Sequence, residues 1–257
     1  MKQLSFLIKY FKYLFSARTA HGIHSPFVFD LYNEVINKKG DYYSFDKIEH
    51  LRKKLLLSKK EIDVTDLGTG KSGKRIVGEI AGRSLKEKKY CELLFRLVYH
   101  FKPTAILELG TSLGITTSYL ASANKNAKVI TIEGCPNTAA EAKKSFESLG
   151  LNNIETVTGD FENVLSSVIC HPSSVDFIFF DGNHRKEPTL KYFEQCLEVA
   201  HNDSVFVFDD IHWSDEMEEA WEEIKSHPDV RVTIDLFFLG LVFFRKEQVK
   251  ENFIIRF

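Results

Sequence analysis

The stretch "AILELGTSLGITTSYL", residues 105–120, decides the fold. It opens with a short apolar run that is typical of a buried strand, continues through a turn that contains Gly110 and Gly114, and ends in a helical pattern. A second apolar run, "KVITIE", follows at 128–133 and ends in Glu133. A strand, a glycine turn, a helix and another strand in this order predict a βαβ unit with parallel strands.

A second glycine-rich stretch, "DLGTGKSGKR" at 66–75, competes for the same role. A loop that holds a nucleotide-type cofactor needs a buried strand before it, a helix N-terminus after it, and an acid at the end of the next strand. The run that leads into this stretch, "EIDVTD" at 61–66, is short and polar, and the charged residues after Gly73 contain no buried strand. The sequence therefore predicts the cofactor loop at Glu108–Gly114.

Strand-like and helical segments alternate from Pro103 onward, which predicts an α/β fold with a mostly parallel sheet. The last part differs, because "VRVTIDLFFLGLVFFR" at 230–245 contains two strand-like runs joined near Gly240. This pattern predicts an antiparallel hairpin at the end of the sheet. Residues 1–60 look helical and basic. We therefore expect a helical N-terminal extension over 1–89 and the main domain over 90–257.

Composition restricts the classes of function. The chain has 257 residues and a net charge of −2, which disfavours nucleic acid as a partner. Its four cysteines form no CxxC pair, which predicts reduced thiols in a cytoplasmic protein. The segment "LSFLIKYFKYLF" at 4–15 is too short and too charged to give a stable membrane span, and no signal-peptide cleavage site follows it. The aromatic content of residues 1–45 favours a homodimer.

The segment "ELGTSLGIT" at 108–116 resembles the first motif, E/D-x-G-x-x-x-G, of the class I S-adenosylmethionine-dependent methyltransferases. The resemblance implies a Rossmann-like, doubly wound, mostly parallel seven-stranded sheet. It also implies that Glu108 accepts hydrogen bonds from the ammonium group of S-adenosylmethionine, that Glu133 binds its ribose, and that "TGD" at 158–160 contacts its adenine. The implied cofactor-binding residues are Glu108, Gly110, Thr111, Ser112, Gly114, Glu133, Gly134, Gly159, Asp160 and Asp181.

Two later segments, "DFIFFDGNH" at 176–184 and "FVFDDIHW" at 206–213, resemble strand ends of the catechol and caffeoyl-CoA type O-methyltransferases. This resemblance implies that Asp181, Asp209 and Asp210 bind Mg²⁺ or another divalent cation. It also implies a small acceptor that is catechol-like or anionic. The chemistry is coherent, because a hard cation with carboxylate ligands can bind both oxygens of a diol and lower their pKa.

The match departs from that family at two places. Asp210 stands where the family usually has Asn, and "DGNHR" replaces the usual continuation after Asp181. An alternative therefore stays open, in which no metal is used and His184 is the catalytic base beside Asp181. Two further alternatives are a metal-independent methyltransferase that acts on a macromolecule or a lipid-linked acceptor, and a non-catalytic binding module.

The glycine-rich stretch at 66–75 then becomes a candidate substrate lid, because segments before the first strand often have this role in the family. Its cationic residues would meet an anionic acceptor, and its glycines would permit closure. The cations are Lys71, Lys74 and Arg75, and the glycines are Gly68, Gly70 and Gly73.

Overall fold

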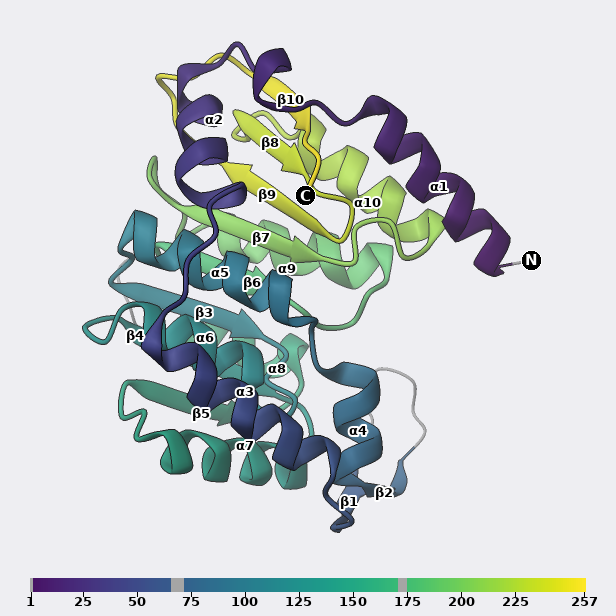
Figure 1. Cartoon of the computed structure of the whole chain (residues 1–257), viewed down its shortest axis with the longest axis vertical. Helices are drawn as coiled ribbons and strands as arrows, with labels where there is room; N and C mark the ends of the chain where they lie inside the picture. Colours follow the sequence, from purple (N-terminus) through teal and green to yellow (C-terminus); the bar gives the residue numbers. More distant parts are fainter. Residues whose placement is uncertain (1, 66–71, 171–174) are drawn as a thin grey trace. The chain divides into compact units, whose positions relative to one another are not determined.

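The computed structural model describes residues 2–65, 72–170 and 175–257, with side chains from residue 6 onward. The chain packs as two compact units (Figure 1). The terminal unit comprises residues 1–38 and 169–257 and so holds both chain ends, whereas the central unit comprises residues 39–168.

The central unit is built on three parallel strands in the order β3-β4-β5. β3 and β4 are almost fully buried, which fits their continuous apolar runs. Helices α5, α6 and α7 pack in succession against one another, and α3 packs on α6. The elements are α3 Tyr43–Leu56, β1 Glu61–Val64, β2 Gly73–Ile76, α4 Val77–Ser84, α5 Lys88–Phe101, β3 Ala105–Leu109, α6 Ile115–Ala123, β4 Lys128–Glu133, α7 Pro136–Leu149, β5 Ile154–Thr158 and α8 Phe161–Ile169.

The terminal unit contains five strands in the order β6-β7-β9-β8-β10. β6 and β7 are parallel, β9 is antiparallel to both β7 and β8, and β10 is parallel to β8. Helices α9 and α10 pack against each other. The elements are α1 Lys2–Ser16, η1 Ala20–Gly22, α2 Pro26–Leu31, the π-helical turn η2 Tyr32–Ile36, β6 Phe177–Phe180, α9 Lys186–Leu197, β7 Val205–Asp209, α10 Asp215–Ser226, β8 Val232–Asp235, β9 Leu239–Phe243 and β10 Glu251–Ile254.

The N-terminal residues are part of the packing of both units. In the terminal unit, the hydroxyl of Tyr13 on α1 donates to the carbonyl oxygen of Ile255 at 2.6 Å. In the central unit, Glu49 on α3 accepts a hydrogen bond of 2.8 Å from the hydroxyl of Tyr119 on α6. The segment before residue 89 therefore contributes core contacts. The domain boundary expected near residue 89 and the lid function stay predictions.

Gly114 allows α6 to approach α7 closely. Its φ of 81° lies in the left-handed region, which favours glycine. A Cβ atom at this position would lie 2.5 Å from Cε1 of Phe146, a buried residue of α7. The turn between β3 and α6 therefore depends on glycine for its backbone conformation and for its packing.

We expect Gly114→Ala to lower the free energy of unfolding by about 3 kcal/mol, because backbone strain and overpacking add at this position. Gly150→Ala is the matched control: its φ is 68°, and no heavy atom lies within 4 Å of the added Cβ. That control should cost only about 1 kcal/mol. Urea denaturation followed by circular dichroism measures both, and equal losses would show that contact with Phe146 contributes nothing.

The C-terminal hairpin forms as predicted, but its turn precedes Gly240. Strands β8 and β9 pair antiparallel, with Asp235 opposite Gly240. The turn lies at 236–238, where Phe237 has a φ of 69° and donates its backbone N–H to Oδ1 of Asp235 at 2.8 Å. Gly240 lies inside β9, where an added Cβ would meet the ring of Trp221 at 2.7 Å. The glycine therefore serves helix packing, and the Asp235 carboxylate supports the turn.

The first glycine-rich stretch has a different structural setting from the second. The strand before it, β1, pairs antiparallel with β2, which begins inside the stretch at Gly73, in a separate two-stranded ribbon. Gly68, Gly70 and Lys71 lie outside the described residues. Lys74 lies on β2 with a side chain 70% exposed, and its ammonium is 3.7 Å from Glu61. Binding of an anionic acceptor by Lys74 and Arg75 stays a prediction.

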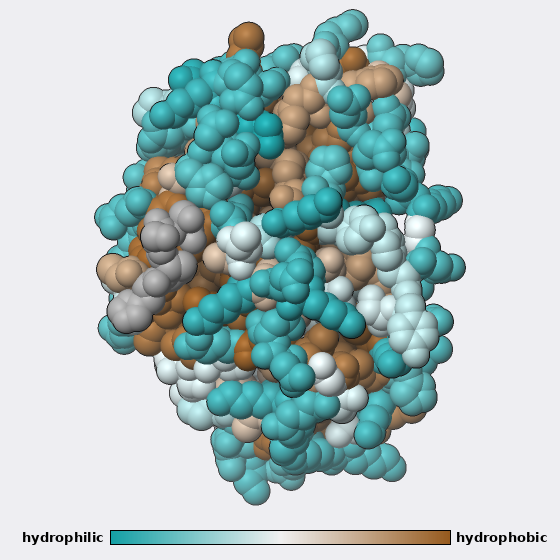
Figure 2. Space-filling model, turned by 90° about the vertical axis from the view of Figure 1, so that its left-hand side faces the viewer, coloured by the Kyte–Doolittle hydropathy of each residue, from teal (hydrophilic) through white to brown (hydrophobic). Residues whose placement is uncertain are grey.

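The predicted fold class, an α/β fold with a mostly parallel sheet and an antiparallel C-terminal pair, is confirmed. Apart from the β1–β2 ribbon, the described residues contain eight strands, one more than the seven expected, because β10 adds beside β8. On the face shown in Figure 2, hydrophilic side chains cover much of the surface, with apolar patches between them. No helix in the described part of the chain is long and apolar enough to cross a membrane.

Candidate functional site

The loop between β3 and α6 has a backbone that few residue types could adopt. Gly110 has a φ of 108° and Ser112 a φ of 47°. The N–H of Gly110 donates to the carbonyl of Ile132 on β4 at 3.0 Å, which ties the loop to the neighbouring strand. The side chain of Thr111 is buried and bonds the hydroxyl of Thr131 at 2.6 Å. Thr111 therefore anchors the loop to the core through its side chain.

Glu133, at the end of β4, turns its carboxylate toward this loop. Its Oε2 accepts the backbone N–H of Ser112 at 2.8 Å, and its Oε1 accepts that of Cys135 at 2.9 Å. Burial raises the pKa of Glu133, and hydrogen bonds from the backbone, including that of Gly134, oppose the rise. The predicted ribose-binding acid thus lies against the predicted cofactor loop, and its side chain is only partly buried.

Glu108 is fully buried at the end of β3. Its Oε2 accepts hydrogen bonds from the hydroxyls of Thr117 and of Thr131, the latter at 2.6 Å. Its Oε1 is also buried and has no hydrogen-bond partner. Burial raises the pKa of Glu108 to about 7, while the two threonine hydroxyls oppose the rise. A carboxylate oxygen left unpaired in the interior is suited to a cationic group such as an ammonium.

The raised pKa of Glu108 predicts a pH-dependent stability of the cofactor-free chain. A carboxyl whose pKa rises from 4.5 to about 7 on folding contributes stability below pH 4.5, and this contribution is lost as the pH rises through about 7. The full loss is about 3 kcal/mol. We expect the free energy of unfolding of Glu108→Gln, relative to that of the wild type, to be higher at pH 8 than at pH 5. Urea denaturation at both pH values measures this difference. The control is Glu155→Gln, which changes an exposed carboxylate on β5. If Glu108→Gln differs from the wild type by the same free energy at both pH values, the prediction is wrong.

Gly159 and Asp160 follow β5. The N–H of Gly159 donates to the carbonyl of Glu133 at 3.0 Å. Oδ1 of Asp160 accepts the N–H of Glu162 at 3.1 Å, and so caps the first turn of α8. The structure therefore brings Gly159 next to Glu133 and gives Asp160 a capping role. Its contact with adenine stays a prediction.

Sequence reasoning missed the threonines that hold Glu108. Thr131 lies in the middle of the apolar strand β4, and Thr117 lies in the first turn of α6. Because the single proton of Thr131 goes to Glu108, Thr111 must donate to Thr131. The sequence signal for this arrangement is Thr131, a hydroxyl residue within the apolar run "KVITIE".

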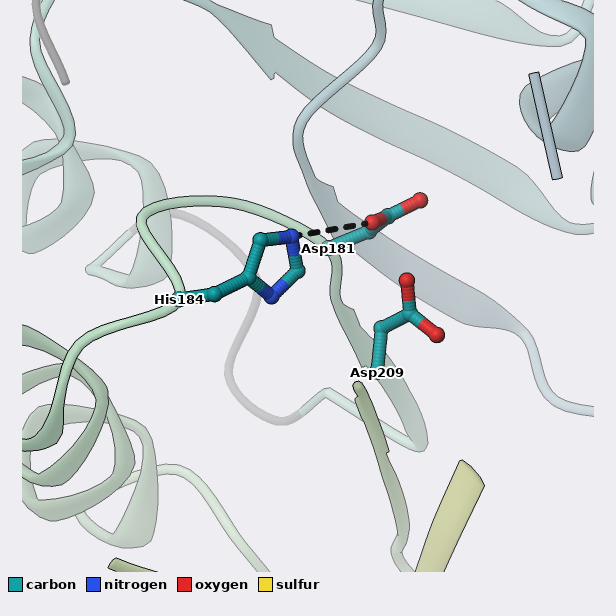
Figure 3. Close-up of side chains that lie close together, drawn as sticks. All are labelled: Asp181, His184 and Asp209. Carbon is teal, nitrogen blue, oxygen red and sulfur yellow. Dashed lines mark ion pairs between the residues drawn. The ribbon is translucent and has the colours of Figure 1, made fainter. Parts of the chain in front are cut away.

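The terminal unit brings three of the predicted residues together (Figure 3). Asp181 follows β6, Asp209 ends β7, and His184 lies in the loop before α9. One ligand atom from each residue lies within 4.8 Å of the other two. Asp209 is 2% exposed, whereas the side chains of Asp181 and His184 are 17% and 29% exposed. Two carboxylates and an imidazole that converge in this way form a donor set suited to a divalent metal.

Asp210 is not part of this group of described residues. Its φ is 53°, so the chain turns sharply directly after β7. Its N–H donates to the carbonyl of Phe238 at 2.7 Å, and its carbonyl accepts the N–H of Trp213 at 2.9 Å. The structure therefore brings together two of the three expected metal ligands, Asp181 and Asp209. The third member of the group is His184, which was the alternative catalytic base.

His212 has a structural role. Its two ring nitrogens lie 2.8 Å from carboxylate oxygens of Glu218 and Asp235, and its ring stacks on Phe237. These partners join the β7–α10 loop to α10 and β8. Helix α1 docks at the same place, because Tyr10 of α1 packs on the Phe237 ring.

Comparison with known proteins supports the motif-based interpretation. Residues 107–211 match a family of methyltransferase domains. A catechol O-methyltransferase from Niastella koreensis is 31% identical over 131 residues, which are 50% of this chain and 57% of that protein. The chain therefore matches a little over half the length of this curated relative.

Solved structures share the fold at low sequence identity. An SAH-bound methyltransferase from Podospora anserina superposes with a TM-score of 0.62 at 13% identity, over 81% of this chain and 91% of that one. An O-methyltransferase from Bacillus cereus in complex with SAH gives a TM-score of 0.58 at 19% identity, over 83% and 94%. Residues 107–211 therefore match a family of methyltransferase domains, and the chain shares the fold of these solved methyltransferase structures.

Proposed function

We propose that the chain transfers a methyl group from S-adenosylmethionine to an oxygen of a small acceptor with neighbouring hydroxyls, such as a catechol. The observation that carries the proposal is the carboxylate of Glu133, which accepts the Ser112 N–H of the glycine loop at 2.8 Å. In a class I methyltransferase fold, this pairing joins a ribose-binding acid to a loop that a nucleoside can approach closely.

The residues of the central unit fit S-adenosylmethionine. The unpaired, buried Oε1 of Glu108 would accept from the cofactor ammonium, which favours the charged carboxylate. Glu133 would accept ribose hydroxyls with its remaining lone pairs. Gly110, without a Cβ, allows the backbone to approach the ligand. Bound to these residues, the cofactor supplies an electrophilic methyl sulfonium.

The residues of the terminal unit fit an acceptor-binding metal. Asp181 and Asp209 would hold a divalent cation, which lowers the pKa of a bound hydroxyl when present. During transfer, the methyl carbon forms a bond to the acceptor oxygen and its bond to sulfur breaks, while the acceptor proton is released. The contribution of the protein is to orient these groups and to exclude water.

The test is methyl transfer from radiolabelled S-adenosylmethionine to catechol, measured with the purified full-length chain. We expect product that depends on the protein and is lost when a chelator is in excess. Product formation that is unchanged by chelator would contradict the metal and favour a metal-independent reaction. No transfer to any diol, together with intact cofactor binding, would favour a macromolecular acceptor or a binding module.

We also propose that the chain works in a reducing compartment and forms a homodimer. None of the four cysteines forms a disulfide, which supports a reducing compartment such as the cytoplasm.

An outward stripe on α1 is formed by Leu7, Phe11 and Phe15, which are 50%, 56% and 89% exposed. This stripe supports the predicted homodimer, which sedimentation equilibrium would test.

A further inference from the structure

We propose that His184, and not Asp210, is the third protein ligand of the metal, and that the site takes a transition metal in preference to Mg²⁺. The use of the ion in catalysis rests on the proposed function, but the binding of the ion is tested directly. It concerns three described residues of the terminal unit, Asp181, His184 and Asp209 (Figure 3).

The spacing of the donor atoms supports a shared ion. Nε2 of His184 lies 3.7 Å from Oδ1 of Asp181, which is too long for a hydrogen bond. Two donors that bind one ion at about 2.1 Å lie about 3.0 Å apart in cis and about 4.2 Å apart in trans. The 3.7 Å separation falls inside that range. All donor atoms of the group lie within 4.8 Å of one another, which exceeds the trans distance by at most about 0.6 Å.

The loop that carries His184 is held in place by its neighbours. Asn183 has a φ of 57°, and its amide donates to the hydroxyl of Tyr192 on α9 at 3.3 Å. The guanidinium of Arg185 donates to Oδ1 of Asn183 at 2.9 Å. Hydrogen bonds therefore join the residues that flank His184 to each other and to α9, and the imidazole lies beside Asp181. A preorganised imidazole of this kind suits a ligand better than a solvated loop residue.

Asp210 is a weaker candidate for the third position. It lies outside the group, and its backbone is fixed by hydrogen bonds to Phe238 and Trp213. Charge leads to the same conclusion, because two carboxylates and a neutral imidazole balance a dication, whereas three carboxylates leave an excess negative charge. In this chain, His184 supplies the donor that Asp210 was expected to supply.

An imidazole ligand changes the choice of metal. Imidazole nitrogen suits ions such as Fe²⁺ and Zn²⁺, whereas Mg²⁺ prefers oxygen donors and retains its water. Mn²⁺, the first ion of the same transition series, serves as the paramagnetic probe. A second consequence concerns the base. An imidazole that binds an ion through Nε2 has no free lone pair on that atom, so His184 would not take the acceptor proton through Nε2.

The experiment measures Mn²⁺ binding to the full-length chain by EPR, without cofactor or acceptor. We expect one bound Mn²⁺ per chain, and pulsed EPR should detect coupling to a histidine nitrogen. His184→Ala should abolish the coupling and weaken Mn²⁺ binding at least about tenfold. Asp210→Asn should leave both unchanged. Mg²⁺ should displace Mn²⁺ only at an excess of about 100-fold or more.

The matched control is His201→Ala, which removes another histidine of the terminal unit that faces an aspartate, Asp176, at 2.9 Å. It should leave Mn²⁺ binding intact. The inference is overturned if wild-type protein binds no Mn²⁺, if bound Mn²⁺ shows no nitrogen coupling, if Asp210→Asn weakens binding more than His184→Ala, or if Mg²⁺ competes equally. Cofactor binding is measured separately by calorimetry, so failure of the methyltransferase proposal would be visible as a separate result.

Discussion

Asp209→Asn should reduce kcat/KM for methyl transfer to catechol by at least about 100-fold while cofactor binding stays within twofold of wild type. Asp209 is 2% exposed at the end of β7, and its ligand oxygen belongs to the group with Asp181 and His184. Asparagine keeps the shape of the side chain and removes the charge that a dication needs. The fold should persist, because loss of a buried charge lowers the cost of desolvation.

The measurements are steady-state kinetics at saturating metal and calorimetric titration with S-adenosylmethionine. Asp203→Asn is the control: this aspartate is 64% exposed and pairs with Arg245 at 3.1 Å in the same unit. It should retain wild-type activity. An Asp209→Asn variant with wild-type kcat/KM would show that the three-residue group has no part in the reaction.

Glu133→Ala should weaken binding of S-adenosylmethionine by about 100-fold, which corresponds to about 3 kcal/mol. The substitution removes the acceptor of the Ser112 and Cys135 backbone N–H groups as well as the carboxylate proposed to bind ribose. It therefore removes a ligand contact and loosens the loop. Glu133→Gln, which retains one acceptor oxygen, should lie between wild type and Glu133→Ala.

Glu155→Ala is the control for Glu133. Glu155 lies on the adjacent strand β5, is 54% exposed and pairs with Lys128 at 2.7 Å. Its loss should change cofactor affinity by less than twofold. Mn²⁺ binding should be unaffected in the Glu133 and Glu155 variants. If Glu133→Ala binds the cofactor as tightly as the wild type, the proposed ribose contact is wrong.

The βαβ architecture could be predicted because the buried strands are continuous apolar runs. β3, β4, β6 and β7 all follow this pattern, and their order along the chain predicted the parallel arrangement. β2 and β10 could not be predicted in this way, because "GKRI" and "ENFI" are short and largely polar. Strands of this kind are recognised only through the partner with which they pair.

The structure brings together only some of the predicted site residues, for reasons that lie in the backbone. Glu133 could be placed at the glycine loop, since the ends of neighbouring parallel strands meet at one edge of a sheet. The choice between His184 and Asp210 could not be made from the sequence. It depends on the positive φ of Asn183 and of Asp210, which no residue pattern in the two loops indicates. The partition of the N-terminal residues between two units likewise depends on tertiary contacts.

The most direct test of the central claim is a calorimetric titration of the purified wild-type chain with S-adenosylmethionine. We predict saturable binding at one site per chain, with S-adenosylhomocysteine competing for the same site. An absence of binding heat at millimolar cofactor over several temperatures would contradict the claim that the Glu108–Gly114 loop holds this ligand.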